Sequence, residues 1–299
     1  MSFSYRWSVL TALLFATGSP AASESPWVWT VDAATVHQGN VDFEQEDGAF
    51  SFDRWYLSAG VDYLWDRRTS LGFAMGGGRS NYDFDLPAGT EPWDEIEDLR
   101  FSLAARFPIN DRATALIRPS YRINREQGAS TGASGTYGLL AGVSWRLNDR
   151  LTIGPGLAVI EQLEESANVF PIVLIDWQIN ERWSLSTGRG VAASEGPGLT
   201  LARTLNDDWS LKLSARYEDI DFRLNDSGAA PGGVGRDRAV PLFLAADWNP
   251  NPGLSLSFFA GAEFAGALIL DDADGRRVSR ADYETAYLLG ATLRVRLRR

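Results

Sequence analysis

The single histidine, His37, is the side chain best suited to acid–base chemistry at neutral pH. A hydrolytic histidine needs a nucleophile and an orienting carboxylate, and sequence spacing fixes neither a serine nor an aspartate beside it. The sequence has no cysteine, which excludes thiolate metal sites, disulfides and cysteine nucleophiles. We therefore predict no enzyme, no catalytic residue, no metal site and no cofactor. A lipid-active enzyme that uses His37 is kept as a third hypothesis.

A second chemically active set consists of charged residues at alternating positions. Between Leu99 and Ile109 the odd positions are mostly large and apolar, whereas the even positions include Arg100 and Arg106. A period of two places these charges on one face of a β-strand. Charges on the inner wall of a pore tune its ion selectivity, although they can also merely keep a wet interior solvated. The predicted pore-lining residues are Arg100, Arg118, Arg122, Arg216, Glu218, Glu263, Asp62 and Asp176.

Short polar turns separate the alternating segments and fix how these segments pair. Residues that face each other across a hairpin lie on the same side of the sheet. The pairs Trp65/Thr69 and Ile109/Ala113, like those at the other turns, fall on the apolar phase of both segments. This agreement predicts a series of antiparallel hairpins with about 14 strands, or about 12 if the segment 183–205 is not a hairpin. The turns lie at residues 66–68, 110–112, 148–150, 180–182, 206–208 and 249–253.

Tryptophans gather beside these turns. Six of them lie within three residues of a short turn and on the apolar phase. A soluble β-sandwich would bury its aromatic residues in the middle of its strands, whereas a transmembrane barrel places them at the membrane interface. We therefore predict an aromatic girdle of Trp65, Trp145, Trp177, Trp183, Trp209 and Trp248.

The first 22 residues have the pattern of a secretory signal peptide. Arg6 supplies the positive charge, and a short apolar run from Ser8 to Gly18 follows it. No linker interrupts the remaining chain, so residues 23–299 are predicted to form one domain. The net charge is −11, and the acidic residues concentrate in the longer connections. Because phosphates need a basic stripe, we predict that this chain does not bind nucleic acid.

The recurring turn motif resembles that of a known class of proteins. The pattern Asn-[Asp/Glu]-[Arg/Asp]-[Trp/Leu]-[Ser/Thr]-[Leu/Ile], as in Asn180 to Leu185, looks like an uncharacterised porin-like family of Gram-negative outer-membrane β-barrels. The resemblance covers nearly the whole mature chain. It implies an all-β fold, a transmembrane antiparallel up-and-down β-barrel, with short turns in the periplasm and long loops outside. One departure is the end of the chain, Val295 to Arg299, where such barrels usually carry a terminal Phe or Trp.

The resemblance also implies a location and partners. It places the protein in the cell outer membrane after export through the periplasm. The expected partners are outer-membrane lipids and, during insertion, the barrel-assembly machinery. The size is similar to that of small monomeric porins, so a monomer is expected.

The size of the predicted barrel bears on function. Fourteen strands at the usual spacing and tilt give a backbone radius of about 14 Å, which side chains alone do not fill. Such a lumen holds water unless loops fold into it. The first hypothesis is therefore a passive porin-like channel for ions or small solutes. The alternative is a non-conducting structural or surface-interaction barrel that acts through its acidic loops. A loop folded into the lumen would favour this alternative.

Overall fold

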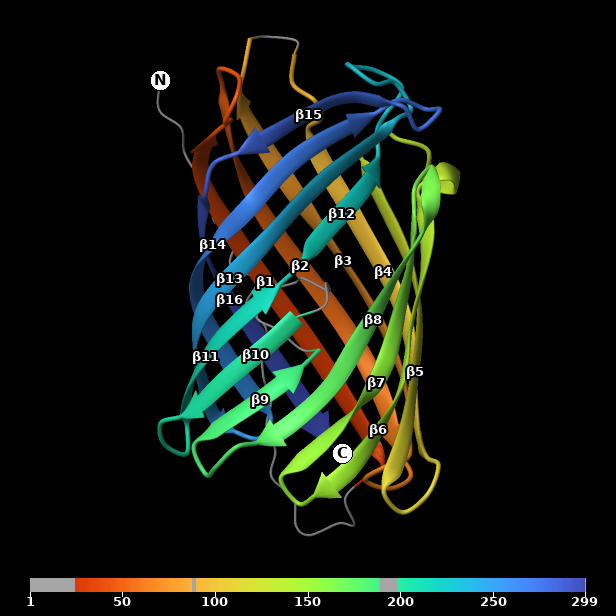
Figure 1. The fold of residues 1–299 in the computed structure, drawn as a ribbon, viewed down its shortest axis with the longest axis vertical. Helices are drawn as coiled ribbons and strands as arrows, with labels where there is room; N and C mark the ends of the chain where they lie inside the picture. Colours follow the sequence, from red (N-terminus) through yellow and green to blue (C-terminus); the bar gives the residue numbers. More distant parts are fainter. Residues whose placement is uncertain (1–24, 88–89, 189–197, 299) are drawn as a thin grey trace.

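The protein forms a closed antiparallel β-barrel, seen in a computed structural model that describes residues 25–87, 90–188 and 198–298 (Figure 1). Each strand pairs with the next along the chain, and the last strand pairs with the first from Val28↔Arg298 to Gln38↔Leu288. The described residues contain 16 strand segments that make up 14 barrel strands, because two of the strands are interrupted. The prediction of 14 strands is confirmed, and the alternative of 12 is wrong. The predicted signal peptide, residues 1–22, lies outside the described residues.

The strand segments follow one another with short or moderate connections. The first eight are β1 (Trp27–Asp42), β2 (Ala49–Leu64), β3 (Ser70–Asp85), β4 (Glu95–Pro108), β5 (Ala113–Glu126), β6 (Gly135–Asn148), β7 (Leu151–Gln162) and β8 (Glu165–Gln178). The others are β9 (Trp183–Thr187), β10 (Gly198–Thr204), β11 (Trp209–Arg216), β12 (Glu218–Arg223), β13 (Val234–Asn251), β14 (Leu254–Asp271), β15 (Arg277–Tyr283) and β16 (Ala286–Arg298). One 3₁₀ turn, η1 (Thr131–Ala133), lies between β5 and β6.

The short turns owe their shape to side chains that bond their own backbone. At the β4–β5 turn, Asn110 Oδ1 accepts the N–H groups of Arg112 at 2.9 Å and Ala113 at 2.8 Å. Asn180, Asn206 and Asp66 do the same at three other turns. Such turns satisfy backbone donors locally and hold a tight reversal. These turns form what we call the short-turn end of the barrel, and the opposite rim is the long-loop end (Figure 1).

Pairing across most of the turns keeps the apolar phase, as the sequence predicts, but at the β6–β7 turn a register shift pairs Asn148, rather than the expected Leu147, with Leu151. Trp65 N–H donates to the Thr69 carbonyl, and Ile109 N–H donates to that of Ala113. At the β13–β14 turn the register differs from the expected one, because Trp248 pairs with Leu256 rather than Leu254. The shift is two residues, so both side chains still lie on the same side of the sheet.

The outer face of the barrel is apolar. Large hydrophobic side chains are exposed along it, among them Leu103, Phe73 and Leu244. The six predicted girdle tryptophans lie on this face beside the short turns, and Trp209 stacks on Trp248 with ring centroids 6.4 Å apart. Their role at a membrane interface stays a prediction. Among the described residues, no helix has the length and apolarity needed to cross a membrane.

The wall bends inward at the long-loop end. β12 pairs with β13 on one side and makes a parallel bridge with β5 on the other, where Arg223 meets Arg125. The strand formed by β11 and β12 is interrupted at Tyr217, near Pro241 of β13, which has no backbone donor for the ladder. Asn124 of β5 also donates to the Asp221 carbonyl at 2.6 Å. β12 therefore crosses the interior instead of following the rim.

An aromatic core fills the interior under these bent strands. Phe50 packs edge-on against Tyr283 at 5.0 Å, and Trp93 packs edge-on against Phe222 at 4.9 Å. Phe43 comes from the β1–β2 connection, Trp93 from the β3–β4 loop and Leu224 from the β12–β13 loop, so three connections contribute to the core. The condition stated for a water-filled lumen thus fails in this part of the barrel. We call this region the aromatic core; its other buried aromatics are Phe43, Phe52, Tyr82, Phe243 and Phe259.

Candidate functional site

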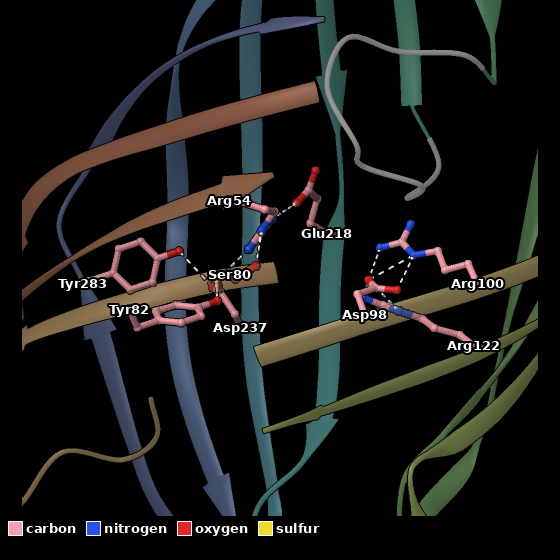
Figure 2. A network of polar contacts seen from close by, with 9 residues as sticks. All are labelled: Arg54, Ser80, Tyr82, Asp98, Arg100, Arg122, Glu218, Asp237 and Tyr283. Atoms are coloured by element: carbon pink, nitrogen blue, oxygen red, sulfur yellow. Dashed lines mark hydrogen bonds and ion pairs between the residues drawn. The ribbon is translucent and has the colours of Figure 1, made fainter. Parts of the chain in front are cut away.

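A pair of arginines and one carboxylate lie on the inner wall at β4 and β5 (Figure 2). Arg100 and Arg122 are direct cross-strand partners, and both bind Asp98, with Nη2–Oδ2 distances of 2.5 Å and 2.6 Å. Arg100 also lies over the ring of Tyr56, 5.1 Å from its centroid. The two positive charges share one negative partner, so the group keeps a net charge of +1.

Three further arginines extend this basic wall toward the short-turn end. Arg106, Arg118 and Arg146 occupy the inner face of β4, β5 and β6, and all three are solvent-exposed. Arg118 lies 3.5 Å from Ser102 Oγ. Side chains can be exposed on an inner face only where the interior has room for water. This part of the wall therefore borders a hydrated lumen.

The opposite wall carries acidic groups and balanced pairs. Ion pairs join Lys212 to Asp247 and Arg294 to Asp32 on the inner face. Asp62 and Asp176 lie nearer the short-turn end, on β2 and β8. The arginines of β4–β6 thus form one basic stretch of the lumen wall, and Arg296 of β16 is a further exposed arginine on the inward phase.

A denser charge cluster lies next to the aromatic core (Figure 2). The Arg54 guanidinium is 4.0 Å from a Glu218 carboxylate oxygen and 3.9 Å from one of Asp237, and Arg54 Nε donates to Ser80 Oγ at 2.8 Å. The Tyr82 and Tyr283 hydroxyls both donate to Asp237, at 2.9 Å and 3.3 Å. All these side chains are largely buried. Burial strengthens such interactions and makes the loss of any one partner costly.

The structure places the predicted pore-lining residues in different parts of the barrel. Arg100 and Arg122 lie together, Arg118 lies further along the same wall, and Asp62 and Asp176 lie apart from them. The other three are buried: Glu218 and Glu263 beside the Arg54 cluster, and Arg216 with a hydrogen bond to the Gly188 carbonyl. A pore-lining role for each stays a prediction.

Sequence reasoning missed several members of these clusters. Asp98 of β4 and Tyr82 of β3 stand at inward-facing positions of the alternating pattern, and this position was the signal that could have identified them. Asp237 gave no such signal, because the sequence around it lacks the apolar alternation of a strand, although β13 begins at Val234. Tyr283 also gave none, because its partner Asp237 is distant in sequence.

His37 is paired with an acid but not with a nucleophile. Its Nδ1 lies 2.8 Å from Asp53 Oδ1, and both side chains are more than half exposed. In the part of the chain that the structure describes, no hydroxyl group is hydrogen-bonded to the imidazole. No group of three or more potential metal ligands is found among the same residues. The enzyme hypothesis stays a prediction that this geometry does not strengthen.

Solved structures share the barrel fold. An outer-membrane channel from Pseudomonas putida F1 superposes with a TM-score of 0.50 at 10% identity, over 94% of this chain and 100% of that one. A FadL homologue from Pseudomonas aeruginosa has a TM-score of 0.42 at 14% identity, covering 90% of this chain and 89% of its own. The KdgM porin has a TM-score of 0.35 at 9% identity, covering 88% and 97%.

The sequence itself has no close counterpart in these comparisons. No protein family matches it, and no curated protein matches it. At such low identity the structural likeness establishes the fold alone. The chain is thus a closed antiparallel barrel of the kind found in outer-membrane channels.

Proposed function

We propose that this protein is a passive channel for ions and small solutes in the bacterial outer membrane, and that its wall favours anions. The observation that carries the proposal is the exposure of Arg106, Arg118 and Arg146 on the inner face of β4–β6. Long cationic side chains that are solvated inside a barrel attract anions and set a field across the lumen. The Arg100–Asp98–Arg122 group continues the same basic wall with a net positive charge.

The outer surface supports the membrane assignment. The apolar outer face and the tryptophans at the short-turn end have the pattern of a lipid-embedded barrel. Short turns face the periplasm in such barrels, so the long-loop end faces outward. Lipids are then the expected contacts of the outer face.

A closed, structural barrel is the second candidate, and the aromatic core favours it. Phe50 and Phe222 are 0% and 1% exposed, so the core leaves no room for solute where they lie. A channel must pass beside this core, whereas a structural barrel needs no passage at all. The two candidates therefore differ in whether current flows.

The test is single-channel conductance of the purified, refolded protein in a planar bilayer under a salt gradient. We expect steady current steps and a reversal potential that shows a preference for anions. Arg118→Glu should reduce that preference, whereas the outward-facing Arg79→Glu should leave it unchanged. If protein that is shown to be folded and inserted carries no current, this result would contradict the channel and favour the structural barrel.

A further inference from the structure

The two faces of the bent β12–β13 segment differ sharply in chemistry. Ile220 and Phe222 of β12 pair with Asp237 and Gly235 of β13, and Phe222 packs in the aromatic core. The alternate residues lie on the other face because side chains alternate along a strand. That face is almost entirely charged. We call it the polar seam, made of Asp219, Asp221, Arg223, Arg236 and Arg238.

Most of the polar seam is buried, whereas 32% of the Arg238 side chain is exposed. The seam lies against the tip of the β7–β8 hairpin, residues 162–165. Arg236 Nη2 is 3.0 Å from Glu165 Oε1, and Arg223 Nη2 is 2.5 Å from Glu164 Oε1. The tip also places a backbone donor on the seam, because Leu163 N–H donates to Asp221 at 2.7 Å.

Several polar atoms in the seam are buried without a hydrogen bond. These atoms are Arg238 Nε, Asp219 Oδ1 and Arg236 Nε, the last two 3.7 Å apart, and Arg236 is only 2% exposed. Buried polar atoms in native proteins are almost always satisfied by protein or by water. A seam with this many unsatisfied groups is therefore a place where ordered water is expected.

The seam is continuous with the basic wall of the lumen. Asn124, which lies two residues from Arg122 on the same face of β5, donates to the Asp221 carbonyl at 2.6 Å. On the side toward β8, the rings of Phe170 and Tyr217 meet with centroids 6.4 Å apart. The seam thus begins where the arginine pair ends, and it reaches the long-loop end under the β7–β8 tip.

We infer that solute passes beside the aromatic core, along the polar seam, and leaves the barrel beneath the β7–β8 tip, which acts as a lid. The inference rests on the proposed channel function and names its route and its regulation. Opening this lid requires the loss of a few polar contacts and the exposure of Leu163, whereas opening the aromatic core would expose its whole buried surface. Glu164 and Glu165 are themselves 37% and 39% exposed, so water and salt reach the contacts that hold the lid.

The absence of native cysteine makes thiol chemistry a clean test of the route. Gln162→Cys and Asp219→Cys would place a thiol in the seam from its two sides, and Ala245→Cys would place one in the aromatic core, where Ala245 is 1% exposed. A charged, membrane-impermeant thiol reagent is added to the folded, inserted protein. Labelling of both seam cysteines should be at least about tenfold faster than labelling of the core cysteine, as local opening is easier there.

Labelling and current together separate this inference from the proposed function. Rapid seam labelling that also reduces the current supports the route. If the seam label leaves the current unchanged, or if a label at Ala245→Cys reduces it, the route is overturned but the channel function is not. Rapid seam labelling in a silent protein leaves the hydrated seam in place and overturns the channel. Slow labelling at both seam positions overturns the inference whatever the current does.

The lid is tested by removing its charges. The double variant Glu164→Gln, Glu165→Gln keeps the size of both side chains and removes the two ion pairs. Because partly exposed pairs contribute little each, seam labelling should rise about threefold to tenfold and become less dependent on salt. The matched control is Glu44→Gln, Glu46→Gln, which makes the same charge change at the β1–β2 connection. An equal rise in the control, or none in the lid variant, would contradict the lid.

Discussion

The two halves of the barrel interior are built from the same alternating strand pattern, but one half is packed and the other is hydrated. At the long-loop end, the inward residues of β2 and β3 are Phe50, Phe52 and Tyr82, and they are buried. At the short-turn end, the inward residues of β4–β6 include Arg106 and Arg146, and they are exposed. Alternation decides only which face a side chain occupies. The chemistry of that face decides whether the interior packs or fills with water.

Strand geometry makes the difference possible. The bend near Tyr217 and Pro241 brings β12 across to β5, and this narrows the long-loop half. No comparable bridge crosses the described strands at the short-turn end, where each strand pairs only with its neighbours. A narrowed space lined by aromatic residues packs, and a wide space lined by arginines does not. Four predictions test this contrast.

The largest expected effect is the loss of a large side chain from the aromatic core. Phe222→Ala should lower the free energy of unfolding by about 4 kcal/mol, because it removes buried surface and leaves a cavity. Arg106→Ala, on the exposed inner wall, should change it by less than about 0.5 kcal/mol. Urea titration of detergent-refolded protein, followed by tryptophan fluorescence, measures both. Similar losses for the two variants would mean that both halves are packed.

The charge cluster beside the core should respond almost as strongly. Arg54→Ala leaves Glu218 and Asp237 without their cation in a buried site, and we expect a loss of about 3 kcal/mol. Acidification should restore part of this loss, since protonation removes the repulsion between the carboxylates. Arg146→Ala supplies the exposed counterpart and should show neither the loss nor the rescue. A pH-independent loss in Arg54→Ala would point to packing rather than charge.

Reversing one charge on the hydrated wall should change selectivity and not stability. Arg118→Glu should change the energy difference between a passing anion and a passing cation by about 1 kcal/mol through water, so the anion-to-cation permeability ratio should fall by about fivefold. The reversal potential under a salt gradient measures this ratio. An equal change in the permeability ratio for Tyr82→Phe, a substitution in the core half, would contradict the distinction between the two halves.

The smallest effect concerns the turns that frame the hydrated half. The backbone N–H of Arg68 donates to the Asp66 carboxylate and lowers the pKa of that group below 3.8, with help from the Thr69 hydroxyl. A lowered pKa means that this contribution to stability is present above 3.8 and is lost as the pH falls through the pKa of the folded state. The difference in unfolding midpoint between wild type and Asp66→Asn should therefore shrink on acidification. A constant difference would contradict an ionised turn.

Much of the barrel could be predicted because its determinants are local. The Asn110 and Asn206 turns are set by side chains that bond backbone groups two or three residues away. The apolar phase survives most of the turns because facing residues share a side of the sheet. Even the two-residue error at Trp248 left the face of that strand correct.

The candidate site could be predicted only in part. The pairing of Arg100 with Arg122 followed from the β4–β5 turn, and the structure places the two together. The same reasoning could have found Asp98, the acid that both arginines bind, because it lies two residues from Arg100 on the same face of β4. The cluster of Arg54 with Glu218 and Asp237 joins distant strands, and no local rule brings these residues together.

The sequence by itself determined the strands, their order, their faces and the closure of the barrel. Each of these depends on interactions between near neighbours, and a period of two is legible in a single chain. Only the tertiary structure decided how the interior is used. The crossing of β12 to β5, the inward fold of Trp93 and the contact of Arg236 with Glu165 all join segments far apart in sequence. Such contacts depend on where the whole barrel places each strand, and no local sequence pattern encodes that placement.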